Sequence, residues 1–168
     1  IHAPHAIDFI RYAAPVQGNY ATAIEAARAS AALVGSEAIG RGQKRIAAPW
    51  LVHKIFGKWD ALIAHEPEHS GTPYLDGMWS YVRGSAAAAT GDLARAQREH
   101  DKLHKIANAE GADEYRVGAT PASDVLKLAA LALEGEVLQA RGDLDGAIRA
   151  FTQAVAIEDQ NNYTEPPD

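Results

Sequence analysis

The sequence predicts an all-α fold made of antiparallel helical hairpins, and three observations support this prediction. A glycine, a polar residue and a large apolar residue occur together four times, at 18–20, 57–59, 91–93 and 142–144. Around these positions apolar residues recur every three or four places, which is the spacing of one helix face. Alanine supplies much of the 47% hydrophobic content, and its small side chain lets helices approach closely.

Each of the four short segments has the residue types that reverse one helix into the next. Glycine suits the left-handed backbone at the end of a helix, and asparagine or aspartate can cap the helix that follows. The last copy is the clearest, and the apolar face after it consists of Leu144, Ala147, Ile148, Phe151 and Val155. Two helices joined by so short a turn pack antiparallel.

The apolar spacing and the turns together predict eight helices. In chain order they are expected at about 4–17, 19–34, 41–56, 58–65, 74–90, 92–109, 122–141 and 143–158. Pro15 and Pro49 fall inside or at the edge of two of them, so each is expected to start or kink a helix. Two longer connections run from Glu66 to Pro73 and from Glu110 to Pro121, and the second is expected to end in a helix start at Thr120-Pro121.

These helices are expected to form a single domain over residues 1–168. Its hairpins are placed at about 4–34, 41–65, 74–109 and 122–158, followed by a tail at 159–168. The chain begins at Ile1 rather than at a methionine, and it is expected to be a fragment of a longer protein. If no further repeat covers it, the last hairpin is expected to expose an apolar edge.

The charge and composition exclude some classes of function. A net charge of −6 argues against a general nucleic-acid binder, which needs a basic face for the phosphates. One local basic cluster, at residues 41–58, is interpreted as a solvated helix face or a modest anion-attracting patch. No cysteine is present, and no apolar run approaches the roughly 20 residues of a membrane span. A soluble protein is expected, and its compartment, cytoplasmic or periplasmic, stays open.

One segment, His65-Glu66-Pro67-Glu68-His69, matches the H-E-x-x-H pattern of zinc proteases. In those enzymes both histidines lie on one face of a continuous helix, with the glutamate beside the metal-bound water. Pro67 interrupts such a helix, because it lacks a backbone donor and clashes with the preceding turn. The segment is therefore interpreted as a loop, and we expect no zinc site there.

Two other histidine groups have the spacing of metal ligands. His100 and His104 are four residues apart on one predicted helix, but basic neighbours disfavour a cation there. His2, His5 and Asp8 can converge at the first helix and form the alternative metal or small-ligand site. No cysteine nucleophile, Gly-x-Ser-x-Gly elbow or phosphate-binding glycine loop is present. We therefore expect no catalytic residues, no metal and no cofactor.

Fixed offsets from the turn glycines point to a repeat. At seven before and five, nine and twelve after the glycine, the fourth copy has Gly135, Ala147, Phe151 and Ala154, and the third has Gly84, Ala96, His100 and Leu103. These positions resemble the tetratricopeptide repeat, and Gly57 and Gly91 are 34 residues apart, the period of that repeat. The other spacings are 39 and 51 residues, so the resemblance implies an irregular α-solenoid.

The resemblance extends to larger bacterial tetratricopeptide-repeat proteins of unassigned role, of which this chain is similar to the C-terminal portion. The segments that carry it are His2-Ala3-Pro4-His5 before Phe9, Phe56 to Asp60, Gly91-Asp92-Leu93 and Tyr163 to Asp168. These segments are specific for the architecture and indicate almost nothing about activity.

In a stack of such hairpins the first helix of each pair lines the concave face, where a partner binds. The expected partner-binding residues are His5, Asp8 and Tyr12, then Lys44, Leu51 and Lys54, then Met78, Tyr81 and Ser85, and finally Glu136 and Gln139. Tyr12, Tyr81 and Trp79 are expected to matter most, because aromatic residues dominate interface hot spots. The alternative for the tyrosines is an amphipathic place at the edge of the core.

These observations favour a non-catalytic scaffold that binds a protein or peptide. The partner is expected to be a peptide, a neighbouring domain of its own longer chain or a second copy as a homodimer mate, with no nucleic acid and no membrane span. Three alternatives remain: a metal- or small-ligand-binding helical protein that uses His2, His5 and Asp8, an accessory domain of a larger enzyme, and a structural segment without a ligand.

Overall fold

The structure is a computed structural model that describes residues 3–35, 39–64, 71–118 and 120–160, and in these ranges the fold is all-α. The helices are α1 Ala3–Val16, α2 Tyr20–Ala32, α3 Ile39–Ile55, α4 Trp59–Ile63, α5 Pro73–Ala89, α6 Leu93–Ala107, α7 Ala122–Ala140 and α8 Leu144–Glu158. His2, the segment 65–69 and the tail at 161–168 lie outside the described residues. Each helix overlaps the range that the sequence predicts.

The four glycine turns lie where one helix reverses into the next, as predicted. Gly18, Gly57, Gly91 and Gly142 have φ values of 70°, 63°, 85° and 85°, which L side chains rarely adopt. At three of the turns the residue after the glycine caps the following helix. Asn19 accepts a hydrogen bond from Thr22 N at 3.1 Å, Asp92 from Arg95 N at 3.0 Å, and Asp143 from Gly146 N at 2.9 Å.

The cap of α8 gives a first testable prediction. Replacing Asp143 by alanine is expected to lower the free energy of unfolding by about 1 kcal/mol, because a backbone donor of the first turn loses its acceptor. Urea unfolding measures the loss. Asp145 lies in the same turn but caps nothing, so Asp145→Ala is the matched control. Equal losses in the two variants would contradict the capping role.

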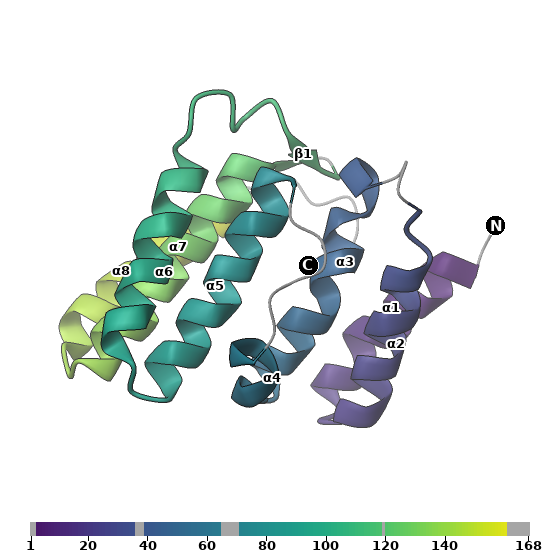
Figure 1. Cartoon of the computed structure of the whole chain (residues 1–168), viewed down its shortest axis with the longest axis horizontal. Coiled ribbons are helices and arrows are strands. Elements are labelled where there is room, and N and C mark those ends of the chain that lie inside the picture. The colour runs from purple at the N-terminus through teal and green to yellow at the C-terminus, as the bar shows by residue number, and fades with distance from the viewer. Residues whose placement is uncertain (1–2, 36–38, 65–70, 119, 161–168) are drawn as a thin grey trace.

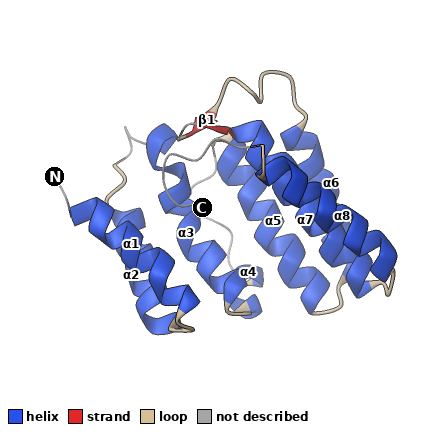
Figure 2. Cartoon of the chain, turned by 180° about the vertical axis from the view of Figure 1, so that it is seen from behind, coloured by secondary structure: helices blue, strands red, loops and turns tan. Residues whose placement is uncertain are grey.

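The helices lie side by side in chain order, from α1 and α2 at one end to α7 and α8 at the other (Figure 1), and the view from behind shows the same order (Figure 2). The helices of each hairpin contact one another, and α2, α4 and α6 also contact the next helix along the chain. In addition α3 contacts α5, and α5 contacts α7. The first helices of the last three hairpins thus form one continuous side of the molecule, which we call the inner face.

The main core lies between α5, α6 and α7, where leucine side chains fit against glycines. A Cβ added at Gly77 would lie 2.5 Å from Leu126, and one added at Gly84 would lie 2.5 Å from Leu133. Both leucines are fully buried. Glycine at these two positions therefore lets α5 and α7 approach more closely than any other residue would allow.

The structure departs from the sequence predictions in the connection before α7. This connection contains a small antiparallel ladder of β1 (Arg116–Val117) and β2 (Thr120–Pro121), which the sequence did not predict. β1 lies against α3, and α7 begins at Ala122, as the sequence predicts, with Pro121 at its N-cap. Of the two roles expected for Pro15 and Pro49, the structure excludes a helix start, because both prolines lie inside α1 and α3.

The apolar edge expected on the last hairpin is present on α8. The exposed fractions of Leu144, Ile148 and Val155 are 61%, 62% and 53%, and they recur at helical spacing along one face. Among the described helices none combines the length and the hydropathy that crossing a membrane requires.

Candidate functional site

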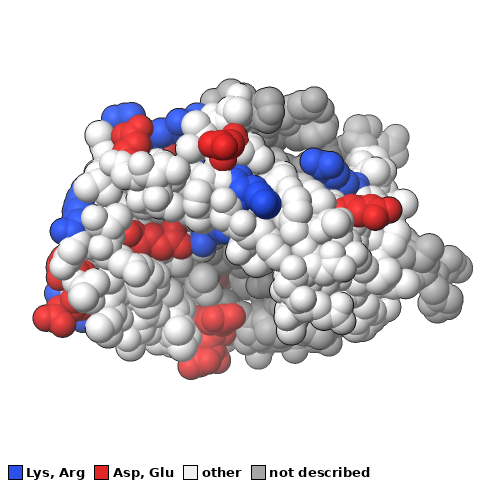
Figure 3. Space-filling view, turned by 90° about the horizontal axis from the view of Figure 1, so that it is seen from below, with Lys and Arg blue, Asp and Glu red and all other residues white. Residues whose placement is uncertain are grey.

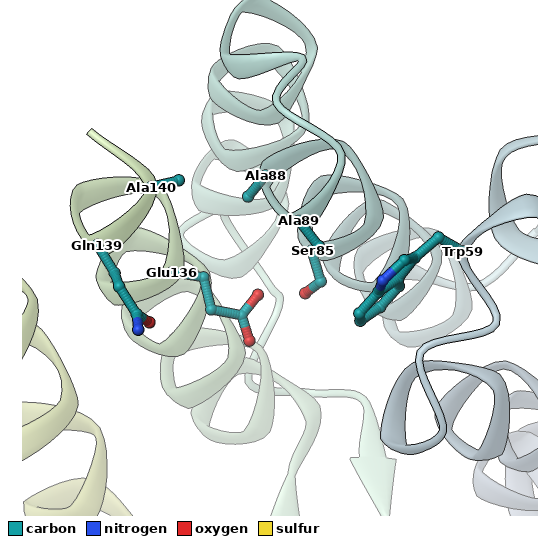
Figure 4. A pocket seen from close by; sticks show the side chains of 7 residues that line it. All are labelled: Trp59, Ser85, Ala88, Ala89, Glu136, Gln139 and Ala140. Carbon is teal, nitrogen blue, oxygen red and sulfur yellow. The ribbon is translucent and has the colours of Figure 1, made fainter. Parts of the chain in front are cut away.

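A groove of about 410 Å³ opens on the inner face, and its size lies within the range of about 300–1,000 Å³ that is common for ligand sites. The start of α4 forms one wall, the last turns of α5 form the floor, and the last turns of α7 form the other wall (Figure 4). The lining residues are Trp59, Ser85, Ala88, Ala89, Glu136, Gln139 and Ala140. We call this feature the inner groove.

The local helix geometry explains why the groove is open. On α5, Tyr81, Ser85 and Ala88 lie at i, i+4 and i+7, so they share one face. The Ser85 hydroxyl donates a hydrogen bond to the Tyr81 carbonyl at 3.0 Å and stays close to its own helix. On α7, Glu136 and Ala140 share a face in the same way. The floor consists of small side chains, so among the described lining residues none on α5 extends into the space between the walls.

An ion pair between α3 and α7 lies beside the groove. The Lys54 ammonium donates a hydrogen bond to Glu136 Oε1 at 2.7 Å and lies 4.8 Å from the centre of the Tyr81 ring on α5. Lys54 is in the last turn of α3, where the helix dipole also favours a cation. Lys54, Tyr81 and Glu136 thus meet in one polar contact, and each comes from the first helix of a different hairpin.

The environment keeps the Lys54 ammonium charged at neutral pH. Burial disfavours the ammonium form of Lys54, but its attraction to Tyr81 and Glu136 is stronger, so the pKa of Lys54 is raised. Burial raises the pKa of Tyr81, and the positive charge of Lys54 offsets part of that effect. Tyr81 therefore remains a neutral phenol near pH 7, and its ring faces the Lys54 cation.

The structure brings together five of the partner-binding residues that the sequence predicts. Ser85, Glu136 and Gln139 line the inner groove, while Lys54 and Tyr81 lie beside it. They come from α3, α5 and α7, which the sequence identified as first helices of successive hairpins.

Four other expected residues do not line the inner groove. Met78 is only 5% exposed and packs in the core, and Leu51 is half-buried against two core clusters. Trp79 is buried with its ring 4.9 Å from that of Trp50, so it faces α3 and not a partner. Lys44 is partly buried and is not among the groove residues.

The three partner-binding residues expected on α1 contact other residues of the first two hairpins. Asp8 accepts hydrogen bonds from Arg45 Nη2 at 2.7 Å and from Ser30 Oγ at 2.8 Å, which tie α1 to α3 and α2. The exposed His5 ring packs edge-on against Phe9, with 4.8 Å between centroids. Tyr12 accepts a hydrogen bond from Arg11 at 2.9 Å. Because Arg45 and Ser30 hold Asp8, the alternative metal site with His5 gains no support.

The Asp8 contacts predict a pH-dependent stability. Partial burial opposes the charged carboxylate, but the hydrogen bonds from Arg45 and Ser30 and the charges of Arg45 and Arg11 are stronger, so the pKa of Asp8 is lowered. This stabilisation is present above the usual pKa of 3.8 and is lost as pH falls through the lowered value. Urea unfolding between about pH 2 and pH 6 should show the difference between wild type and Asp8→Asn shrinking toward low pH. A difference that stays constant would contradict this linkage.

Sequence reasoning missed Trp59, the aromatic wall of the groove. It is the large residue of its turn, a position interpreted as the start of a buried helix face. In the structure α4 has only five residues, and Trp59 at its first position is half-buried and lines the groove (Figure 4). The shortness of the predicted helix was the available signal, because so short a helix cannot bury a whole face.

The structure places the histidines and the charged side chains of the described residues as follows. No group of three histidine, aspartate or glutamate side chains gathers there, and the His100 and His104 rings lie 6.2 Å apart between centroids. Seen along the edge that carries the glycine turns, acidic and basic side chains of the described residues are interspersed on a mostly uncharged surface (Figure 3).

Comparison with known proteins gives no further assignment. No family model matches the chain, and no curated protein and no solved structure matches it.

Proposed function

We propose that this protein is a non-catalytic scaffold of the tetratricopeptide type, which presents its inner face to a protein or peptide partner. The single observation that carries the proposal is the inner groove, with its half-buried tryptophan, its floor of small side chains and its adjoining ion pair. Aromatic side chains beside a cavity are typical anchors of protein interfaces.

The arrangement of the helices supports the repeat architecture. Three antiparallel hairpins have helices of comparable length, and each second helix contacts the hairpin that follows. Stacked helix pairs of this kind form extended surfaces on the side of their first helices. The 34 residues between Gly57 and Gly91 match the period of the tetratricopeptide repeat.

The chemistry of the inner face favours binding over catalysis. Its acid and base, Glu136 and Lys54, hold each other in an ion pair, and the raised pKa of Tyr81 keeps its hydroxyl protonated. A general acid or base needs a pKa near the working pH, and a nucleophile needs a base beside it. The groove residues supply neither.

A selection for peptide ligands tests the proposal. Immobilised protein is exposed to a phage library of random peptides, and the selected peptides are titrated into labelled protein while backbone amide signals are recorded. We expect the largest shifts at Tyr81, Ser85 and Gln139. The matched control is Gln153 on α8, which is exposed and outside the groove. Peptides that shift only the signals of α6 and α8, or no selected peptides, would contradict the proposal.

The apolar face of α8 favours a second partner, either another copy or a neighbouring domain. Leu144, Ile148 and Val155 are more than half exposed, and a further helix packed on α8 would cover them. We expect sedimentation velocity to show self-association that increases with protein concentration and is lost in Ile148→Glu. The exposed Gln153 makes Gln153→Glu the control for added charge on the same helix. A wild type that stays monomeric at every concentration would exclude the second copy.

A further inference from the structure

The inner groove contains a carboxylate of which one oxygen is hydrogen-bonded by a described residue. Glu136 lines the groove, and Lys54 bonds its Oε1 atom. Within the described part of the chain no donor lies on Oε2, and the carboxylate points toward the groove (Figure 4). Its side chain is 24% exposed, so a second donor can reach it from solvent.

The chain itself shows which chemistry suits this carboxylate. The Lys54 ammonium is held between Glu136 and the face of Tyr81, at 2.7 Å from Oε1 and 4.8 Å from the ring centre. The groove offers a second combination of the same kind, since Trp59 and Glu136 face each other across Ser85 (Figure 4). Tryptophan is the aromatic ring that attracts cations most strongly.

The backbone adds to this preference for a positive charge. Both α5 and α7 reach the groove with their last turns, at Ala88 and Ala89 and at Gln139 and Ala140. The C-terminal end of a helix carries partial negative charge and favours cations. The net charge of the chain, −6, attracts basic partners at longer range.

The floor suits the stem of a long basic side chain. Ala88, Ala89 and Ala140 leave apolar walls in a space of about 410 Å³. Lysine and arginine place their methylene groups on such surfaces while the charged end stays at a polar group. Arginine fits better than lysine here, because its planar group stacks on a tryptophan and donates several hydrogen bonds to a carboxylate.

We infer that the inner groove binds a basic side chain of the partner, with arginine preferred over lysine. The guanidinium lies between Glu136 Oε2 and the Trp59 ring, and its stem lies on the alanines of α5 and α7. This inference rests on the proposed function, because it names the partner chemistry that the inner face selects.

The test uses the full chain and a short blocked peptide, acetyl-Gly-Gly-Arg-Gly-Gly-amide, titrated while the Trp59 indole and Ser85 amide signals are recorded. The comparison peptide has citrulline, which keeps the shape of arginine without its charge. We expect the citrulline peptide to bind about fivefold to tenfold more weakly, since hydrogen bonds to charged groups are about twice as strong as neutral ones. Equal binding of both peptides would overturn the inference.

Variants of α7 and α3 test the atoms involved. Glu136→Gln is expected to weaken binding of the arginine peptide by about fivefold or more. Glu134 is an exposed carboxylate on the same helix outside the groove, so Glu134→Gln is expected to leave the binding unchanged. Lys54→Met removes the cation that competes for Glu136 and is expected to tighten binding. Thermal unfolding of each variant shows whether it is folded. The inference would be overturned if a folded Lys54→Met variant bound the arginine peptide more weakly than wild type. It would also be overturned if the two glutamate variants changed the binding equally.

The two proposals fail in different ways. If phage-selected peptides shift the inner-face signals but lack basic residues, the scaffold function stands and the basic-side-chain inference is wrong. If no peptide, selected or designed, shifts these signals, the scaffold function itself is contradicted.

Discussion

Replacing Leu133 by alanine is expected to lower the free energy of unfolding by about 2–5 kcal/mol. Leu133 is fully buried between α5 and α7, and its methyl groups lie against Gly84. Glycine has no side chain that can move into the cavity, so the loss should fall in the upper part of the range. Urea unfolding followed by far-UV circular dichroism measures the change.

Leu144 provides the matched control for this prediction. It is the same residue type in the same fold, but it is 61% exposed on α8. Leu144→Ala should change the free energy of unfolding by no more than about 0.5 kcal/mol, as surface substitutions usually do. Similar losses for the two variants would mean that α5 and α7 are not packed through Leu133.

Replacing Trp79 by alanine is expected to lower the free energy of unfolding by about 3–5 kcal/mol, at least as much as Leu133→Ala. Trp79 is buried in the cluster that joins α4 to α5, together with Leu62 and Val82, and it contacts Trp50 of α3. Its loss would therefore weaken the second hairpin and its attachment to the third. The free energy is again obtained from urea unfolding.

Two variants serve as controls for Trp79. Trp59→Ala removes the same side chain from a half-buried position, so it should lower the free energy of unfolding by clearly less than Trp79→Ala. Trp79→Phe keeps a buried ring, and the indole Nε1 that it removes has no hydrogen-bond partner among the described residues. The phenylalanine variant should therefore recover most of the loss. A larger loss for Trp59→Ala than for Trp79→Ala would contradict the assigned burial of the two tryptophans.

Most of the helices could be predicted from the sequence, because local signals define them. The glycine turns combine a left-handed backbone with a capping side chain, and both act within a few residues. The ladder at 116–121 could not be predicted in this way. Its strands have two residues each, too few for an alternating pattern, and one of them lies against α3, which is distant in the sequence.

The candidate site was only partly predictable. The order of the hairpins indicates which helices line the inner face, and it assigned Lys54, Tyr81 and Glu136 to that face, but the contacts among the three side chains come only from the structure. The rotation of α5 about its axis was harder to predict, because most of this helix is buried and its apolar residues surround it. Met78 and Trp79 were therefore assigned to a binding surface although they belong to the core.

The ion pair between Lys54 and Glu136 also has a mechanical consequence. It joins side chains that are 82 positions apart in the sequence and connects the second hairpin to the fourth across the third. A row of helix pairs bends through small rotations between neighbours, and a bond that skips one pair limits those rotations. A partner side chain that binds Glu136 Oε2 leaves Lys54 on Oε1, so the groove can be occupied while the second and fourth hairpins stay connected.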